Sequence, residues 1–183
     1  RGQSAGETSI CTVGVTGSGL TYRGYDVVDL AENTTFEEVA YLLLHEKLPN
    51  SQKLKDYIEK LKSLRGLQPE LRSALEGIPK TAHPMDVLRT GCSVLGNLEK
   101  EEGFLNQTDH ADRMLSAFPS ILSYWYQFSH HGKRIDTETN DDTIGGHFLH
   151  LLHGKKPSQL HKQVMSVSLI LYAEHEFNAS TFA

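Results

Sequence analysis

The densest group of side chains that could do chemistry lies in residues 171–183. Tyr172, His175, Asn178 and Ser180 lie close together there, directly after an apolar stretch with helical spacing. Buried polar groups need hydrogen-bonding partners, so such a cluster either joins helices or faces a polar ligand. An imidazole that donates one N–H into a pocket, beside an amide, can hold the oxygens of a small organic acid. We therefore predict a ligand site in this segment.

The element that must position this cluster is the last predicted helix, which begins at Pro157-Ser158 and runs to about Glu174. If the helix continues, Tyr172 and His175 share one face because they are three residues apart. The neighbouring carboxylates of Glu174 and Glu176 could fix the tautomer of the imidazole. The spacing therefore predicts a ligand-facing end of a core helix.

Other histidines offer weaker hypotheses. His147, His150 and His153 recur at every third position of a predicted helix, where zinc ligation competes with a role as polar edges of a buried helix. The second interpretation is favoured, because no cysteine is close and apolar residues fill the positions between them. His83 precedes a helix, where a histidine either bonds local backbone or borders a pocket. We expect no metal site.

The composition excludes several classes of protein. The 183 residues are 38% apolar and 22% charged, which is typical of one globular domain, or of one domain and a piece of another. The net charge of −5 comes without a basic stripe, so we expect no nucleic-acid partner. No apolar run is long enough to span a bilayer, and no signal peptide opens the chain. Cys11 and Cys92 form no CxxC pair, which favours a reducing cytoplasm.

The residue pattern predicts an all-α fold with a short N-terminal β-hairpin, made by residues 10–13 and 20–23, and a disordered tail at residues 1–8. Asp26, Thr34 or Thr35, Thr108 or Asp109, and Asp142 or Thr143 are the expected helix caps. The predicted helices cover residues 26–30, 36–48, 51–65, 69–75, 84–95, 109–131, 144–153 and 158–174. Residues 97–106 and 131–143 are expected to form loops, the second of them mobile.

Five segments, read in order, resemble the citrate synthase family. They are Tyr22-Arg23-Gly24-Tyr25, Phe36-Glu37-Glu38-Val39-Ala40-Tyr41-Leu42-Leu43, Leu48-Pro49, His83-Pro84-Met85-Asp86-Val87 and Glu174-His175-Glu176-Phe177-Asn178-Ala179-Ser180-Thr181. Each segment alone is a modest signal, but their order and spacing together are specific. The resemblance implies a multi-helix large domain over residues 9–183, with the small domain and the C-terminal part of the fold absent.

Finer features resemble the 2-methylcitrate synthase branch of this family, among them the segments 85–91, 121–126, 144–154 and 171–175. That branch condenses propionyl-CoA with oxaloacetate in propionate catabolism. The resemblance implies an acyltransferase that works as a homodimer, with a CoA thioester as substrate and no other cofactor. Condensation of acetyl-CoA to citrate is the alternative activity. A non-catalytic helical interaction or metal-binding module is the alternative from another class.

The resemblance also assigns roles to single residues. His175 matches the family histidine that hydrogen-bonds oxaloacetate, and Asn178 contacts the same ligand. Ser180 matches a supporting position, and Tyr172 lies where acyl groups are discriminated. The family's catalytic histidines and aspartate have no counterpart within these 183 residues. We therefore expect a truncated chain that is inactive by itself.

Overall fold

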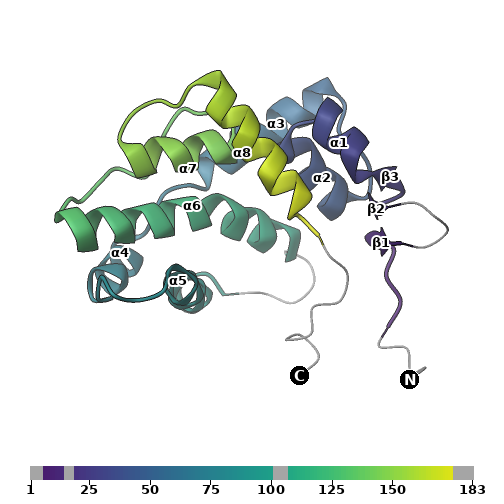
Figure 1. Cartoon of the computed structure of the whole chain (residues 1–183). Helices are drawn as coiled ribbons and strands as arrows, with labels where there is room; N and C mark the ends of the chain where they lie inside the picture. The colour runs from purple at the N-terminus through teal and green to yellow at the C-terminus, as the bar shows by residue number, and fades with distance from the viewer. Residues whose placement is uncertain (1–5, 15–18, 101–106, 175–183) are drawn as a thin grey trace. The chain divides into compact units, whose positions relative to one another are not determined.

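The structure, a computed structural model, describes residues 6–14, 19–100 and 107–174. Within these ranges, eight helices and one small sheet make up the regular structure (Figure 1), which confirms the predicted helical class. The chain divides into two compact units. Unit 1 combines Arg1–Tyr57 with Gln163–Ala183, and unit 2 is Ile58–Lys162.

The N-terminal sheet has three antiparallel strands: β1 (Cys11–Val13), β2 (Leu20–Tyr22) and β3 (Tyr25–Asp26). Cys11 pairs with Tyr22 in the predicted hairpin, which is confirmed. The short third strand was not expected. It forms because Arg23 and Gly24 both adopt positive φ, 49° and 86°, the backbone that a tight two-residue hairpin turn requires.

Local capping explains where the first two helices begin. In α1 (Val27–Asn33), the Asp26 carboxylate accepts a hydrogen bond from the Val28 N–H at 2.8 Å. In α2 (Phe36–His45), Thr35 and Glu38 form a reciprocal capping box. Such caps satisfy backbone donors that the first turn of a helix leaves unpaired. Both predicted starts are therefore confirmed.

Six further helices follow: α3 (Ser51–Ser63), α4 (Pro69–Glu76), α5 (Pro84–Leu98), α6 (Gln107–His131), α7 (Ile144–His153) and α8 (Gln159–Leu171). Several predicted bounds are wrong: helix α1 continues past Leu30 to Asn33, and helices α2 and α8 end at His45 and Leu171, before the predicted residues 48 and 174. Helix α5 continues to Leu98 instead of ending at Leu95, and Thr108 and Asp109 lie inside α6 instead of capping it. No helix in the described ranges is both long and apolar enough to cross a membrane.

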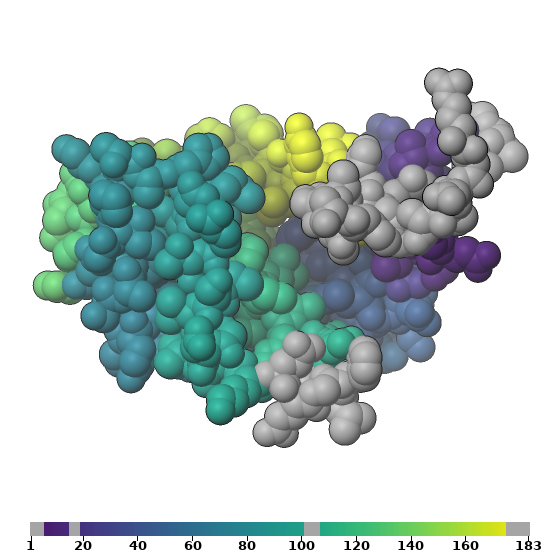
Figure 2. All heavy atoms as spheres, turned by 90° about the horizontal axis from the view of Figure 1, so that it is seen from below, coloured from purple at the N-terminus to yellow at the C-terminus, as the bar shows by residue number. Residues whose placement is uncertain are grey.

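Unit 2 is built around α6. Helices α4 and α5 pack on one side of it and α7 on the other (Figure 1), and Figure 2 shows α4 and α5 side by side on the surface. Gly91 permits close approach, since a Cβ there would lie 2.7 Å from Cγ2 of Ile121. The buried core comprises Leu67, Leu71, Leu75, Val87, Leu95, Ala117, Ile121, Tyr124 and Trp125.

The connection between α6 and α7 has no helix or strand, as predicted, and two of its side chains are buried within unit 2. Thr137 is fully buried and Asp141 is 5% exposed. The guanidinium of Arg65 donates to the carbonyl of Thr139 at 2.7 Å. Single polar residues of this mostly exposed connection are therefore buried, because some of its polar groups find partners inside the protein.

Candidate functional site

The predicted ligand segment is described only as far as Glu174. Helix α8 ends at Leu171, short of the predicted end, so Tyr172 lies beyond the helix and the assumed common helical face does not apply to it. The Tyr172 side chain is 87% exposed. The other three predicted residues, His175, Asn178 and Ser180, lie outside the described residues.

The C-terminal end of α8 is fixed by strand β2. Tyr22 is fully buried, and its hydroxyl donates to the Ile170 carbonyl at 2.9 Å. The same carbonyl accepts from the Ala173 N–H at 3.2 Å, an i+3 bond that tightens the last turn. Burial raises the pKa of Tyr22, so the hydroxyl keeps its proton and remains a donor. Unit 1 therefore holds the backbone that leads toward His175.

A second bond holds the middle of α8. The Ser166 hydroxyl accepts from the backbone N–H of Phe36, the first residue of α2, at 3.0 Å. This N–H is one of the donors that the first turn of a helix cannot satisfy internally. Two side-chain bonds to residues far away in the sequence thus anchor residues 163–171 of α8, the part of the helix that belongs to unit 1.

Unit 2 contains a buried polar cluster around His147 on α7. The ring is fully buried, with Nε2 3.0 Å from the Ser120 hydroxyl and Nδ1 3.0 Å from the Thr139 hydroxyl. Both hydroxyls can donate or accept, so they suit a neutral imidazole with one N–H. Burial, together with the nearby charge of Arg65, lowers the pKa of His147 to about 3. This residue is a neutral structural group at physiological pH.

Asp141 completes the buried cluster. Its carboxylate lies 2.6 Å from the Lys162 ammonium and accepts a hydrogen bond from the Thr143 hydroxyl at 3.1 Å. These contacts keep the pKa of Asp141 below its ordinary value although burial opposes them. Gly146 is required beside it, because a Cβ there would collide with the Asp141 carboxylate. Thr143 also caps α7, as predicted.

The structure also describes the surroundings of His150, His153 and His83. His153 is exposed and His150 only half-buried, so the three histidines of α7 differ in environment. Across the part of the chain that the structure describes, no three His, Cys, Asp or Glu side chains are grouped to hold a metal ion. Nδ1 of His83 accepts from the Met85 N–H at 3.2 Å, the local backbone bond that was one of its two interpretations.

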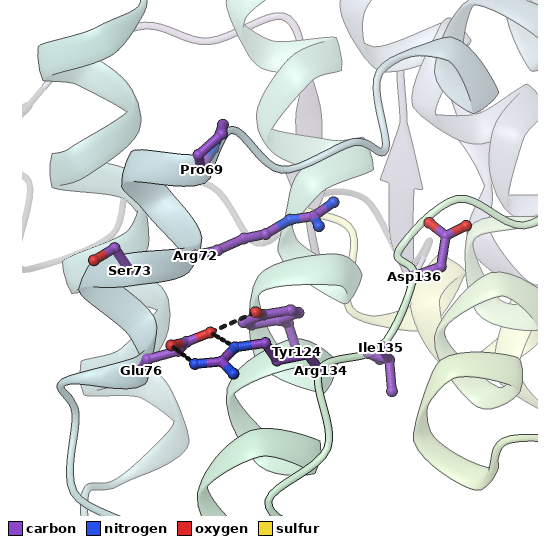
Figure 3. A pocket seen from close by; sticks show the side chains of 8 residues that line it. All are labelled: Pro69, Arg72, Ser73, Glu76, Tyr124, Arg134, Ile135 and Asp136. Carbon is purple, nitrogen blue, oxygen red and sulfur yellow. Dashed lines mark hydrogen bonds and ion pairs between the residues drawn. The ribbon is translucent and has the colours of Figure 1, made fainter.

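A hollow of about 630 Å³ opens in unit 2 between α4, α6 and the following loop (Figure 3). Within it, Glu76 accepts hydrogen bonds from the Tyr124 hydroxyl at 2.7 Å and from Arg134 through both carboxylate oxygens at 2.7 Å. These bonds lower the pKa of Glu76 to about 2. Its lining residues are Pro69, Arg72, Ser73, Glu76, Tyr124, Arg134, Ile135 and Asp136.

No sequence pattern indicated this hollow. Arg72 and Glu76 are four apart, a spacing that by itself indicates an ordinary ion pair along a helix. Instead, Glu76 bonds to Arg134, 58 positions away. A partner at that distance leaves no local signal, so only the packing of α4 beside α6 reveals the arrangement.

The chain was compared with known protein families, and one family matches it over its whole length. The whole chain, residues 1–183, matches the family described as "Citrate synthase, C-terminal domain". The chain belongs to the citrate synthase family. This bears out the resemblance found in the sequence motifs.

Two curated relatives illustrate where the chain falls within the family. It is 70% identical over 182 residues to a 2-methylcitrate synthase of Shewanella oneidensis, which covers 100% of the chain and 48% of that protein. It is 37% identical over 190 residues to 2-methylcitrate synthase 2 of Corynebacterium glutamicum, covering 99% of the chain and 49% of the relative. The chain therefore spans about half the length of these relatives.

A solved structure supports the fold. The citrate synthase of Thermotoga maritima superimposes with a TM-score of 0.82 at 33% identity, covering 100% of this chain and 48% of the solved one. The helical arrangement described above is thus the arrangement of a citrate synthase over this portion of the polypeptide.

Proposed function

We propose that the protein containing this chain is a 2-methylcitrate synthase, which condenses propionyl-CoA with oxaloacetate and water to 2-methylcitrate and free CoA. The observation that carries this proposal is the 70% identity to the Shewanella oneidensis enzyme over the whole chain. Identity to the Thermotoga maritima citrate synthase is 33% over the same span. Because both comparisons cover half of the relatives, the activity belongs to the full-length protein.

In this reaction, the α-carbon of the propionyl group loses a proton and forms a carbon–carbon bond with the keto carbon of oxaloacetate, whose oxygen takes up a proton to become a hydroxyl. Water then cleaves the thioester and releases CoA, so the enzyme is an acyltransferase that needs no cofactor besides the CoA of its substrate. We place the enzyme in the cytoplasm, in propionate catabolism, as a homodimer.

His175 is assigned the role of orienting and polarising the oxaloacetate carbonyl, with Asn178 on the same ligand and Ser180 in support. Tyr172 is assigned to the acyl pocket. Two features support this placement: α8 is anchored by Tyr22 and Ser166, and the exposed Tyr172 ring is free to contact a substrate. A rigid support improves the precision of a binding site.

The decisive experiment compares propionyl-CoA with acetyl-CoA on the full-length protein. Release of the CoA thiol is followed at saturating oxaloacetate, and the product mass is determined. A higher kcat/KM with propionyl-CoA, with 2-methylcitrate as product, supports the proposal. Preference for acetyl-CoA would assign the protein to citrate synthesis instead, and no turnover with either thioester would favour a non-catalytic module.

The role of His175 is tested by His175→Ala in the full-length enzyme. Loss of a hydrogen bond to a reacting carbonyl is expected to lower kcat/KM for oxaloacetate about a hundredfold. His161→Ala is the matched control, since His161 is an exposed histidine on α8. Equal kinetics of the two variants would remove His175 from the oxaloacetate site.

A further inference from the structure

Arg72 carries a positive charge that the described part of the protein does not pair. Its side chain has no ion pair and no hydrogen-bond partner among the described residues, and its Nε is buried without a partner. The guanidinium carbon lies 5.7 Å from the centre of the Tyr124 ring. Unpaired buried donors are rare in native proteins and call for an explanation.

Of the two carboxylates that line the hollow, Glu76 is neutralised by another arginine, and neither is paired with Arg72. Glu76, one turn along α4, accepts from Tyr124 and binds Arg134 through both oxygens. Asp136 lies across the hollow (Figure 3), where its carboxylate accepts from the Glu138 backbone N–H at 3.0 Å. Neither carboxylate forms an ion pair with Arg72, so its charge remains available.

The charged end of the Arg72 side chain points into the hollow (Figure 3). In Figure 3 the Arg72 side chain extends from α4 into the hollow, above the Tyr124 ring, with the terminal nitrogens at its free end. Pro69 and Ile135 contribute apolar surface to the lining. A planar guanidinium presents paired N–H donors whose geometry matches a carboxylate or phosphate.

We propose that this hollow binds a small molecule bearing an oxyanion, a carboxylate or a phosphate, with Arg72 as its anchor. The oxyanion accepts from the terminal nitrogens of Arg72, and the remainder of the ligand lies against Tyr124 and Ile135. The site is built entirely within unit 2 and is independent of the proposed synthase reaction.

Chemical protection tests the site in the full-length protein. Arginines are modified with phenylglyoxal, with or without millimolar inorganic phosphate or succinate, and modification of Arg72 is measured by peptide mass spectrometry. We expect Arg72 to react in the absence of a probe and to be protected by at least one probe. Which of the two protects identifies the phosphate or the carboxylate as the preferred group.

Binding of the protecting probe is then measured by titration calorimetry on matched variants. Arg72→Gln is expected to weaken binding about tenfold, the effect of losing one charge-assisted contact. Arg89→Gln removes an equal charge from an exposed arginine on α5 that forms an ion pair with Asp86, and leaves binding unchanged. Arg72→Lys keeps the positive charge but loses the paired N–H donors of the guanidinium, and is expected to give an intermediate affinity.

Three outcomes would overturn the proposal. In the first, Arg72 resists modification without any probe, because other parts of the full-length protein cover it. In the second, neither probe slows the modification of Arg72. In the third, Arg72→Gln and Arg89→Gln weaken probe binding equally. The protection experiment uses the unmodified sequence, so the proposal stays falsifiable even if a variant does not fold.

Discussion

Two polar regions of unit 2 differ in how completely their charges and hydrogen bonds are satisfied. Around His147, each ring nitrogen has a hydroxyl neighbour, and the buried Asp141 is paired with Lys162. Around Arg72, the neighbouring carboxylate is bonded elsewhere and the guanidinium faces an open hollow. A satisfied network stabilises a fold, whereas an uncompensated charge at a hollow is available to a ligand. The difference separates a structural cluster from a binding site.

The largest expected effect comes from removing the centre of the satisfied cluster. His147→Ala leaves a cavity and deprives the buried Ser120 and half-buried Thr139 hydroxyls of their ring partner, which is expected to cost about 3–4 kcal/mol of unfolding free energy. Urea denaturation of the full-length protein measures this loss. A change below about 1 kcal/mol would show that the cluster does not stabilise unit 2.

Breaking the buried ion pair is expected to cost somewhat less. Asp141→Asn removes the charge opposite Lys162 and is expected to destabilise the protein by about 2–3 kcal/mol, because the partly buried Lys162 ammonium loses its counterion. Adding Lys162→Met removes the unpaired charge and should recover part of this loss. A double variant no more stable than Asp141→Asn would contradict the assigned pairing.

The pH dependence of stability tests the neutral state of His147. Its pKa is about 3 in the folded protein against 6.5 ordinarily, so below about pH 6.5 the unfolded chain binds a proton that the folded chain does not. Stability therefore falls as the pH falls, by up to about 1.4 kcal/mol per pH unit from this group. Thermal melts of the wild type and of His147→Gln between pH 7 and about pH 4.5 measure the difference. Identical slopes would contradict a neutral buried imidazole.

The smallest effect is expected at Arg72. Arg72→Gln loses a cation–π contact with Tyr124 but no ion pair, so its cost is expected to stay below about 1 kcal/mol. The same urea denaturation measures it beside His147→Ala. A loss as large as that of His147→Ala would show that Arg72 is structural, and the contrast between the two regions would disappear.

Features that depend on neighbouring residues were predictable. Asp26, Thr35 and Thr143 cap their helices as expected, because a cap bonds backbone donors only two or three residues away. The family motifs in order indicated the fold, although the oxaloacetate residues assigned through them remain predictions.

Features that depend on distant residues were not predictable. The polar sequence after α6 predicted a mobile loop but not its buried contacts, in which Arg65 and His147 bond Thr139. Helix α8 was expected to reach Glu174, but the Tyr22 hydroxyl and the Ala173 N–H share the Ile170 carbonyl where the helix closes. In both places a long-range hydrogen bond decided the local structure.

The sequence alone therefore determined the helical class, most helix starts, the N-terminal hairpin and the family, because these rest on periodicity, capping and ordered motifs along the chain. The tertiary structure decided which polar groups are satisfied and which are left for a ligand. Glu76 illustrates the reason: its sequence neighbour Arg72 could have paired with it, but the packing of α4 against α6 brought Tyr124 and Arg134 to it instead. Tertiary packing determines which of these side chains pair, and the spacing of residues along the sequence does not indicate the result.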